Sequence, residues 1–471
     1  MRLSHMVPVV AASFDEPNLV SCAGLVPVMG LAARAGLADL ADRYLTVPSD
    51  KGANAGGKVS ALVAGMVAGA DSIDDMALLR HGGMARLFER TYAPSTLGSF
   101  LRSFRFGHVR QLDAVASRFL AGLVDCTPLL DGVGGPVFVD VDDTIIEVHG
   151  YAKQGAGFGY SGVRGLNALL ATVTTPTCAP LIVAQRLRAG QANSARGAKR
   201  LVADALATLA RLRGPKTGTP VLVRADSAFY GHATVGAAIS AGAQVSVTVR
   251  MDPKIKAAIS AIADDAWTTI NYTDAVFDEQ TRRWISRAEV AEISFTAFSS
   301  RKAAERVTGR LIVRRIPDVN TDSKQDSLFD AWRFHAFFTT SDLDTVTADK
   351  THRGHAVIEQ VNADLKNSAL AHLPDVILSQ LVGHGFDLRL CVVDVSPTRP
   401  VGVVGQHGPM SFLVVRSGVS RPAVRPRVRL RRCSPSASAR ASRSAWLSCS
   451  SRRIRSVAAS SRRSSEASVA R

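Results

Sequence analysis

The sequence has few cysteines, and none of them stands at a spacing that binds metal. Six cysteines are scattered over 471 residues, with no CxxC pair and no Cys/His cluster. This pattern excludes a disulfide scaffold and a structural zinc site, and it favours a reducing compartment. Long apolar runs are also missing, because the longest uncharged stretch, 165–185, contains Asn167, Pro176 and Pro180. The N-terminal residues lack the apolar core of a signal peptide. We therefore expect a cytoplasmic protein without a membrane partner.

Acidic residues are almost absent from the last part of the chain. Residues 421–471 contain 14 arginines, no lysine and one acid, Glu466, a net charge of +13. The whole chain carries +17, so the first 420 residues carry only +4. A large positive excess predicts a polyanionic partner such as nucleic acid. Here most of that excess belongs to one terminal segment.

The rest of the composition is that of a globular protein, with 46% hydrophobic and 21% charged residues. Residues 1–130 show mainly helical spacing of apolar side chains. Two helical segments on either side of Gly107 carry Arg102, Arg105 and Arg110. This arrangement is compatible with a helix-turn-helix that contacts DNA, and equally with an ordinary bundle whose arginines are solvated.

From residue 131 the pattern predicts an α/β layer. An alternating strand at 137–148 begins a meander of three strands, and strands at 220–227 and 244–250 follow, each after a helix. Residues 265–345 then show β-type patterning, and helical spacing returns from Asp349.

Aspartates gather at two of the predicted strands. Asp142 lies in the first strand between Asp140 and Asp143, and Asp226 ends the strand at 220–227. Active residues of α/β sheets collect at strand ends. Two carboxylates brought together there repel each other unless a proton or a cation lies between them, and Mg²⁺ is the usual cation. A single strand-end aspartate, in contrast, is most often a turn or cap residue.

The segment 352–366, HRGHAVIEQVNADLK, predicts a helix with two distinct faces. Val357, Val361 and Leu365 recur every four residues and predict the core stripe. The other face carries His352, His355, Glu359, Asn362 and Lys366. Such a face suits a carboxylate metal ligand among phosphate-binding donors, although a solvated polar face is the commoner outcome.

The motifs VDVDDT, RADS and HRGHAVIEQVNADLK, in this order, resemble the DDE transposases of bacterial insertion sequences. The resemblance covers about residues 1–373. It implies that Asp142, followed by Thr144, is the first catalytic acid and Asp226 the second. Glu359 matches the third, with Lys366 at the family's spacing. His352 and His355 replace the family's Tyr and Arg.

The resemblance also implies a mechanism and partners. Asp142, Asp226 and Glu359 would hold two Mg²⁺ ions, with Mn²⁺ as a substitute, for DNA strand cleavage and strand transfer. The partner would be double-stranded DNA, bound by a homodimer at the nucleoid. The residues expected to contact DNA are Lys366, His352, His355, Arg353, Arg102, Arg105 and Arg110.

The expected fold is α/β, an RNase H-like mixed sheet with helices, preceded by a helical domain and interrupted by a β-rich insertion. The expected domains are a helical DNA-end-binding domain (1–130), the first part of the catalytic core (131–264), the β-rich insertion (265–345), the segment with the catalytic helix (346–374) and an atypical basic tail (375–471).

Two alternatives stay open. The motif FVDVDDTII also fits haloacid dehalogenase-like phosphatases, in which Asp140 would be the nucleophile and Asp142 the acid/base. The other is a transposase relic that binds transposon ends without cutting them. The tail motivates it, because the Arg/Ser-rich composition after Pro374 suggests a frameshift near 374–376. A genuine basic DNA-binding tail is the competing interpretation.

Overall fold

A computed structural model describes residues 17–148, 155–214, 218–278, 283–317 and 332–366. Side chains are described for these ranges except within 271–287. The predictions for the basic tail, 375–471, and for the frameshift near 374–376 lie outside the described residues.

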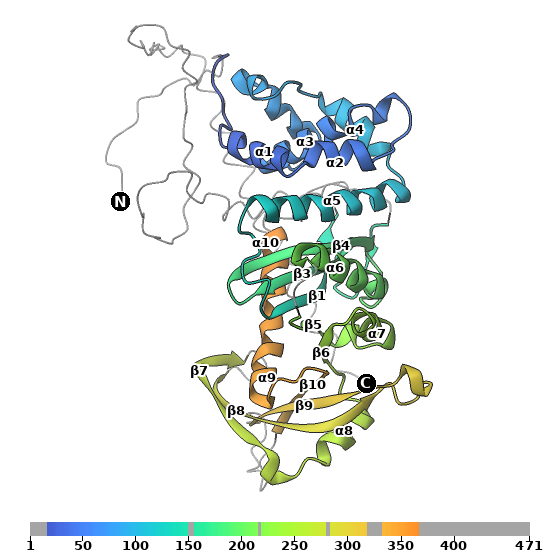
Figure 1. The fold of residues 1–471 in the computed structure, drawn as a ribbon, viewed down its shortest axis with the longest axis vertical. Helices are drawn as coiled ribbons and strands as arrows, with labels where there is room; N and C mark the ends of the chain where they lie inside the picture. The colour runs from blue at the N-terminus through green and yellow to red at the C-terminus, as the bar shows by residue number, and fades with distance from the viewer. Residues whose placement is uncertain (1–16, 149–154, 215–217, 279–282, 318–331, 367–471) are drawn as a thin grey trace, which may run out of the picture. The chain divides into compact units, whose positions relative to one another are not determined.

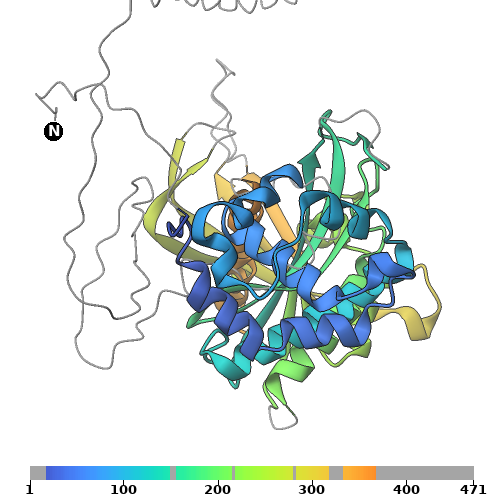
Figure 2. The ribbon, with the colours of Figure 1, turned by 90° about the horizontal axis from the view of Figure 1, so that it is seen from above.

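The N-terminal part is helical, as the apolar spacing predicted. Its helices are α1 (Leu25–Arg34), α2 (Leu37–Tyr44), α3 (Ala55–Val67), α4 (Pro94–Arg102) and α5 (Phe106–Cys126), and its 3-10 turns are η1 (Asp50–Gly52), η2 (Asp74–Arg80) and η3 (Gly82–Leu87). These helices lie together in one layer (Figure 2). They enclose a core of their own that includes Leu62, Phe100 and Phe119. Only three residues separate α4 from α5, and the backbone N–H of Arg105, the N-cap residue of α5, donates to Nδ1 of His108 at 3.1 Å.

The described strands form one mixed sheet. They are β1 (Val137–Glu147), β2 (Gly157–Phe158), β3 (Arg164–Thr175), β4 (Cys178–Ala189), β5 (Val221–Ala225), β6 (Gln244–Thr248), β7 (Thr268–Asp278), β8 (Arg283–Ala297), β9 (Val307–Pro317) and β10 (Trp332–Thr339). The order is β2-β3-β1-β5-β6-β10-β9-β8-β7, with β4 also on β3. β3 is antiparallel to β1, whereas β5 is parallel to both β1 and β6. The β-type pattern of 265–345 thus corresponds to strands that extend this sheet through β10.

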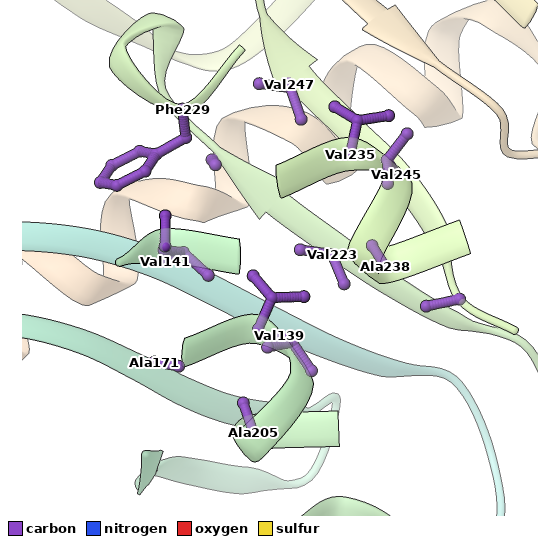
Figure 3. Packing of buried hydrophobic residues seen from close by; sticks show 14 of the residues in the cluster. Val139, Val141, Ala171, Ala205, Val223, Phe229, Val235, Ala238, Val245 and Val247 are labelled. Carbon is purple, nitrogen blue, oxygen red and sulfur yellow. The ribbon is translucent and has the colours of Figure 1, made fainter. Parts of the chain in front are cut away.

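Valines occupy every second position along the first part of β1, and this alternation gives the sheet one apolar face. Val137, Val139 and Val141 are buried with residues of α6 (Ala198–Arg213) and α7 (His232–Ser240) in the larger core. Figure 3 shows valines of β1, β5 and β6 together with Ala205 of α6 and Val235 of α7. Helix α8 (Pro253–Ser260), which the sequence pattern did not predict, adds Ile255 and Ile259 to this core.

The opposite face carries the polar side chains of the same strands. It meets α9 (Thr345–Arg353), the 3-10 turn η7 (Gly354–Ala356) and α10 (Val357–Lys366), with α10 beside β1 and α9 beside β8 and β9 (Figure 1). The helix predicted over 352–366 is therefore interrupted by one tighter turn.

The predicted core stripe of that helix is wrong. Val357, Val361 and Leu365 are only half-buried, whereas the buried residues of α10 are Ile358 and Asn362. The reason is that the facing strand presents aspartates, which draw a polar helix face inward. Across the described part of the chain, no helix has the length and apolar character needed to cross a membrane.

Candidate active site

The sheet register places Asp142 and Asp226 next to each other. Val141 of β1 pairs with Ala225 of β5 in parallel register, Asp142 follows Val141 in β1, and Asp226 follows Ala225, the last residue of β5. The Asp226 carboxylate also accepts a 2.9 Å hydrogen bond from the backbone N–H of Ala228, which caps the 3-10 turn η4 (Ser227–Phe229). The two acids that the motifs singled out, 84 residues apart, therefore meet at one place in the sheet.

Asp140, two residues earlier in β1, is fully engaged inside the protein. Its side chain is 0% exposed, and Arg224 donates to both of its oxygens at 2.7 Å. Nδ1 of His355 lies 2.9 Å from Oδ1 of the same carboxylate. Asp140 thus joins β1 to β5 and to the turn before α10.

Asp143 is neutralised in a similar way by a different arginine. Nη2 of Arg188 lies 3.0 Å from its carboxylate, and the side-chain amide of Asn167 also donates to it. Arg188 Nε in turn donates to Asn167 Oδ1 at 3.0 Å. Two of the three aspartates of β1 are therefore each bound to a guanidinium.

No arginine among the described residues pairs with Asp142 in this way. Nδ2 of Asn362 donates to its Oδ2 at 2.9 Å. Burial raises the pKa of the Asp142 carboxyl to about 6, and the negative charges of Asp226 and Asp143 add to the rise. Burial also raises the pKa of Asp226. A pair of adjacent carboxyls whose charged forms are both disfavoured gains from a bound cation.

Asn362 supplies a further oxygen at this place. Its Oδ1 is buried and has no hydrogen-bond partner among the residues that the structure describes. A buried, unpaired amide oxygen costs free energy unless something binds it. Carboxylate and amide oxygens are the ligands that hard divalent cations prefer, so the donor set of Asp142, Asp226 and Asn362 fits Mg²⁺ or Mn²⁺.

Glu359 is exposed on α10. It lies one helical turn after His355 and one before Asn362, the two residues through which this segment bonds to β1. Within the described ranges, no three side chains of the His, Cys, Asp or Glu types are grouped closely enough to hold a metal ion. The structure thus brings Asp142 and Asp226 together but does not group Glu359 with them.

The residues expected to contact DNA differ in their exposure and in the groups to which they bond. Lys366 is exposed at the last residue of α10, and Arg353 is held by Asp349 at 2.9 Å. Arg105 is exposed, and Arg102 donates to Ser99 at 3.2 Å.

Three other predicted DNA contacts are engaged within the protein. His355 bonds to Asp140, and Arg110 forms ion pairs with Asp113 and Asp204. His352 stacks on Phe337, with both ring nitrogens within 3.0 Å of hydroxyl groups.

The environment of His352 leads to a testable pH effect. Burial lowers the pKa of this imidazole to about 3, with nearby cations contributing. Because the folded pKa lies below the unfolded value of about 6.5, its contribution to stability is complete above pH 6.5 and declines as the pH falls towards 3. Between pH 7.5 and 5, wild type should lose about 2 kcal/mol of unfolding free energy relative to His352→Gln.

The measurement is urea unfolding of both proteins at the two pH values. Carboxyls with raised pKa values titrate in both proteins, so their effect cancels in the difference. A constant difference between wild type and variant would contradict the buried, neutral state of His352.

The phosphatase alternative requires Asp140 as the nucleophile. Both oxygens of that carboxylate are held by Arg224, one also by His355, and the side chain has no exposed surface. A nucleophile must reach the substrate, so this position does not suit the role.

Sequence reasoning did not identify Arg224 and Arg188 as parts of this region, and it gave Asn362 no role as a cation ligand. Arg224 stands in the motif RADS, but nothing in the sequence shows that its partner lies 84 residues earlier. Asn362 was placed on the correct helix face, where its i+3 position from Glu359 was the available signal.

The chain was compared with known protein families and with curated proteins. Residues 5–321 match the family described as "Transposase DDE domain group 1". The match includes Asp142 and Asp226 and ends before Glu359. A comparison with curated proteins gave no match.

Proposed function

The chain belongs to the DDE-domain transposases, and on this premise we propose that it cuts and joins DNA strands at the ends of an insertion sequence with the help of divalent metal ions. The family match covers more than half of the chain and assigns a transposase function. Strand cleavage, strand transfer and the binding of two Mg²⁺ ions are the parts that we propose beyond the family assignment.

One observation carries the proposal: Asp142 and Asp226 adjoin each other with no arginine partner among the described residues, in a sheet that supplies arginines to the two neighbouring acids. A structural role for Asp142 would be served best by the same neutralisation that Asp140 and Asp143 receive. The pKa of Asp142, raised to about 6, and the unpaired oxygen of Asn362 point the same way. Such perturbed groups concentrate at functional sites.

We assign the following roles to the residues of the site. Asp142 and Asp226 hold the cations, and Glu359 completes the ligand set from α10. The bonds of Asp140 to Arg224 and His355 fix α10 and its preceding turn against β1 and β5. Lys366, at the end of the same helix, contacts the DNA backbone.

Bound metal ions would supply Lewis-acid stabilisation of charge on the phosphodiester oxygens and promote deprotonation of the attacking hydroxyl. In cleavage the attacking oxygen comes from water, and in joining it comes from a DNA 3′-hydroxyl. In each case one phosphorus–oxygen bond forms and another breaks, and the leaving deoxyribose oxygen gains a proton. A nucleophilic side chain is not required.

The order β4-β3-β1-β5-β6, a meander of three antiparallel strands followed by two parallel ones, supports an RNase H-like core. We further propose that the helices of 1–130 bind transposon ends, that 265–345 is an insertion into the core, and that the enzyme acts as a homodimer on DNA. In this proposal 346–374 supplies the third carboxylate.

The relic is the second candidate function, and one observation favours it. Glu359 does not group with the two aspartates in the described structure. A protein in which the third carboxylate never reaches the metal would bind DNA but cut it poorly.

DNA cleavage by the full chain distinguishes these functions. The substrate is supercoiled plasmid carrying the element's terminal sequences, with Mg²⁺, Mn²⁺ or EDTA. Nicking in both metals and none in EDTA is the expected result. Binding without nicking in either metal would support the relic and contradict the proposal.

A further inference from the structure

A polar cleft of about 240 Å³ lies between α5, β4 and α6, among residues other than those of the candidate active site. Its walls carry four arginines and two aspartates, namely Arg110, Arg118, Arg200, Arg211, Asp113 and Asp204. Ser117, Gln185 and Thr208 add polar groups that carry no charge. Positive charge is therefore in excess around this cleft.

The two aspartates do not neutralise all four arginines. Asp204 alone pairs with Arg110 at 3.2 Å, with Arg200 at 3.0 Å and with Arg186 beside the cleft. One carboxylate thus serves three guanidinium groups. A site with more positive than negative side chains attracts an anion.

Arg118 and Arg211 have no carboxylate partner among the described residues. Nη1 of Arg118 donates to the carbonyl of Ala114 at 3.0 Å, and Nη1 of Arg211 donates to Ser117 Oγ at 3.3 Å. A guanidinium has five N–H donors, so each of these arginines retains donors for a ligand.

Gln185 gives an independent sign of a ligand. Its side chain is 8% exposed and lines the cleft, and its Nε2 has no hydrogen-bond partner in the part of the chain that is described. Leaving a buried amide N–H unpaired costs about 1–3 kcal/mol. An acceptor bound in the cleft would remove that cost.

We propose that this cleft binds a phosphate of the DNA backbone, with Arg118, Arg211 and Gln185 donating to its oxygens. The inference rests on the proposed function, because DNA is the polyanion on which such an enzyme acts. The guanidinium fork matches the paired oxygens of a phosphodiester, and an amide N–H adds a third donor. The wall formed by α5 joins this contact to the helical part expected to bind DNA ends.

The experiment measures DNA affinity of the full chain by fluorescence anisotropy, with a labelled duplex of arbitrary sequence and EDTA present. The test variant is Arg200→Gln/Arg211→Gln, since both side chains are exposed and their loss spares the core. The matched control is Arg301→Gln, which removes an exposed arginine after β8, outside the cleft and outside the helices of 1–130. Arg118→Lys is a second variant that keeps the charge and loses the fork.

The double variant removes one proposed phosphate contact, Arg211, and the positive charge of Arg200 beside it. It should weaken binding roughly tenfold near 0.1 M salt and reduce the slope of log affinity against log salt by about 1 to 2. Arg118→Lys should lose affinity with little change in slope, and Arg301→Gln should resemble wild type. Equal thermal midpoints of variants and wild type would show that the fold is kept.

Wild-type affinity in the double variant would overturn the cleft assignment and leave the proposed function standing. Failure of wild type to bind any duplex would instead remove the proposed function. Protection of the wild-type fold by inorganic phosphate, combined with unchanged DNA affinity in the double variant, would identify a small-anion site and overturn the inference.

Discussion

Asp142→Asn should reduce metal-dependent DNA nicking roughly a thousandfold. The reason is that a bound metal stabilises the transition state by several kcal/mol, and each 1.36 kcal/mol corresponds to a factor of ten in rate. The amide keeps the size of the side chain and removes the charge that binds the cation. The measurement is the initial rate of plasmid nicking in Mg²⁺, with Asp226→Asn expected to behave alike.

Glu359→Gln tests the third carboxylate in the same assay. Its matched control is Asp364→Asn, an exposed acid on the same helix α10. Loss of nicking in Glu359→Gln with retention in Asp364→Asn is expected. If both variants nick as wild type does, the third ligand is not Glu359.

Arg224→Met should destabilise the fold by about 3–5 kcal/mol, since it leaves the buried carboxylate of Asp140 without its main partner. Arg224 also donates to the carbonyl of Thr351 at 2.6 Å, so the substitution loosens α9 as well. The same contact explains Gly354, where a Cβ would stand 2.6 Å from Arg224 Nη1. Denaturant unfolding at neutral pH measures the loss.

The double variant Asp140→Asn/Arg224→Met serves as the control for this prediction. It removes the uncompensated charge together with its partner, so part of the stability should return. A double variant that is less stable than Arg224→Met would show that the ion pair is not the source of the effect.

The sequence predicted most elements of the sheet because their patterns are local. The alternation of Val137, Val139 and Val141 indicated a half-buried strand at 137–148, and β1 spans Val137–Glu147. The third strand of the predicted meander corresponds to β4, Cys178–Ala189, whose apolar signal is confined to its centre because polar residues lie towards its C-terminal end.

Sequence reasoning could not identify ion pairs between residues that lie far apart in the chain. The motif gave three acids in β1 without a physical basis for choosing among them, and the choice of Asp142 came from the family resemblance. The structure supplies a physical basis, because Arg224 binds Asp140 and Arg188 binds Asp143. Both arginines reach their acids only through the pairing of neighbouring strands.

The inward face of α10 shows the same limit. Val357 and Val361 repeat at helical spacing, so hydrophobicity alone predicted that this stripe faces the core. The buried residues are Ile358 and Asn362, and the amide of Asn362 bonds to Asp142. Which face of a helix is buried depends on the surface it meets, and this surface is acidic.

The central claim, that Asp142 and Asp226 bind divalent metal ions, is tested most directly by Mn²⁺ titration of the full chain without DNA, followed by electron paramagnetic resonance of free Mn²⁺. Wild type should take up Mn²⁺, and both Asp142→Asn and Asp226→Asn should weaken that uptake at least tenfold. Mn²⁺ uptake that is equal in wild type and both variants would contradict the claim.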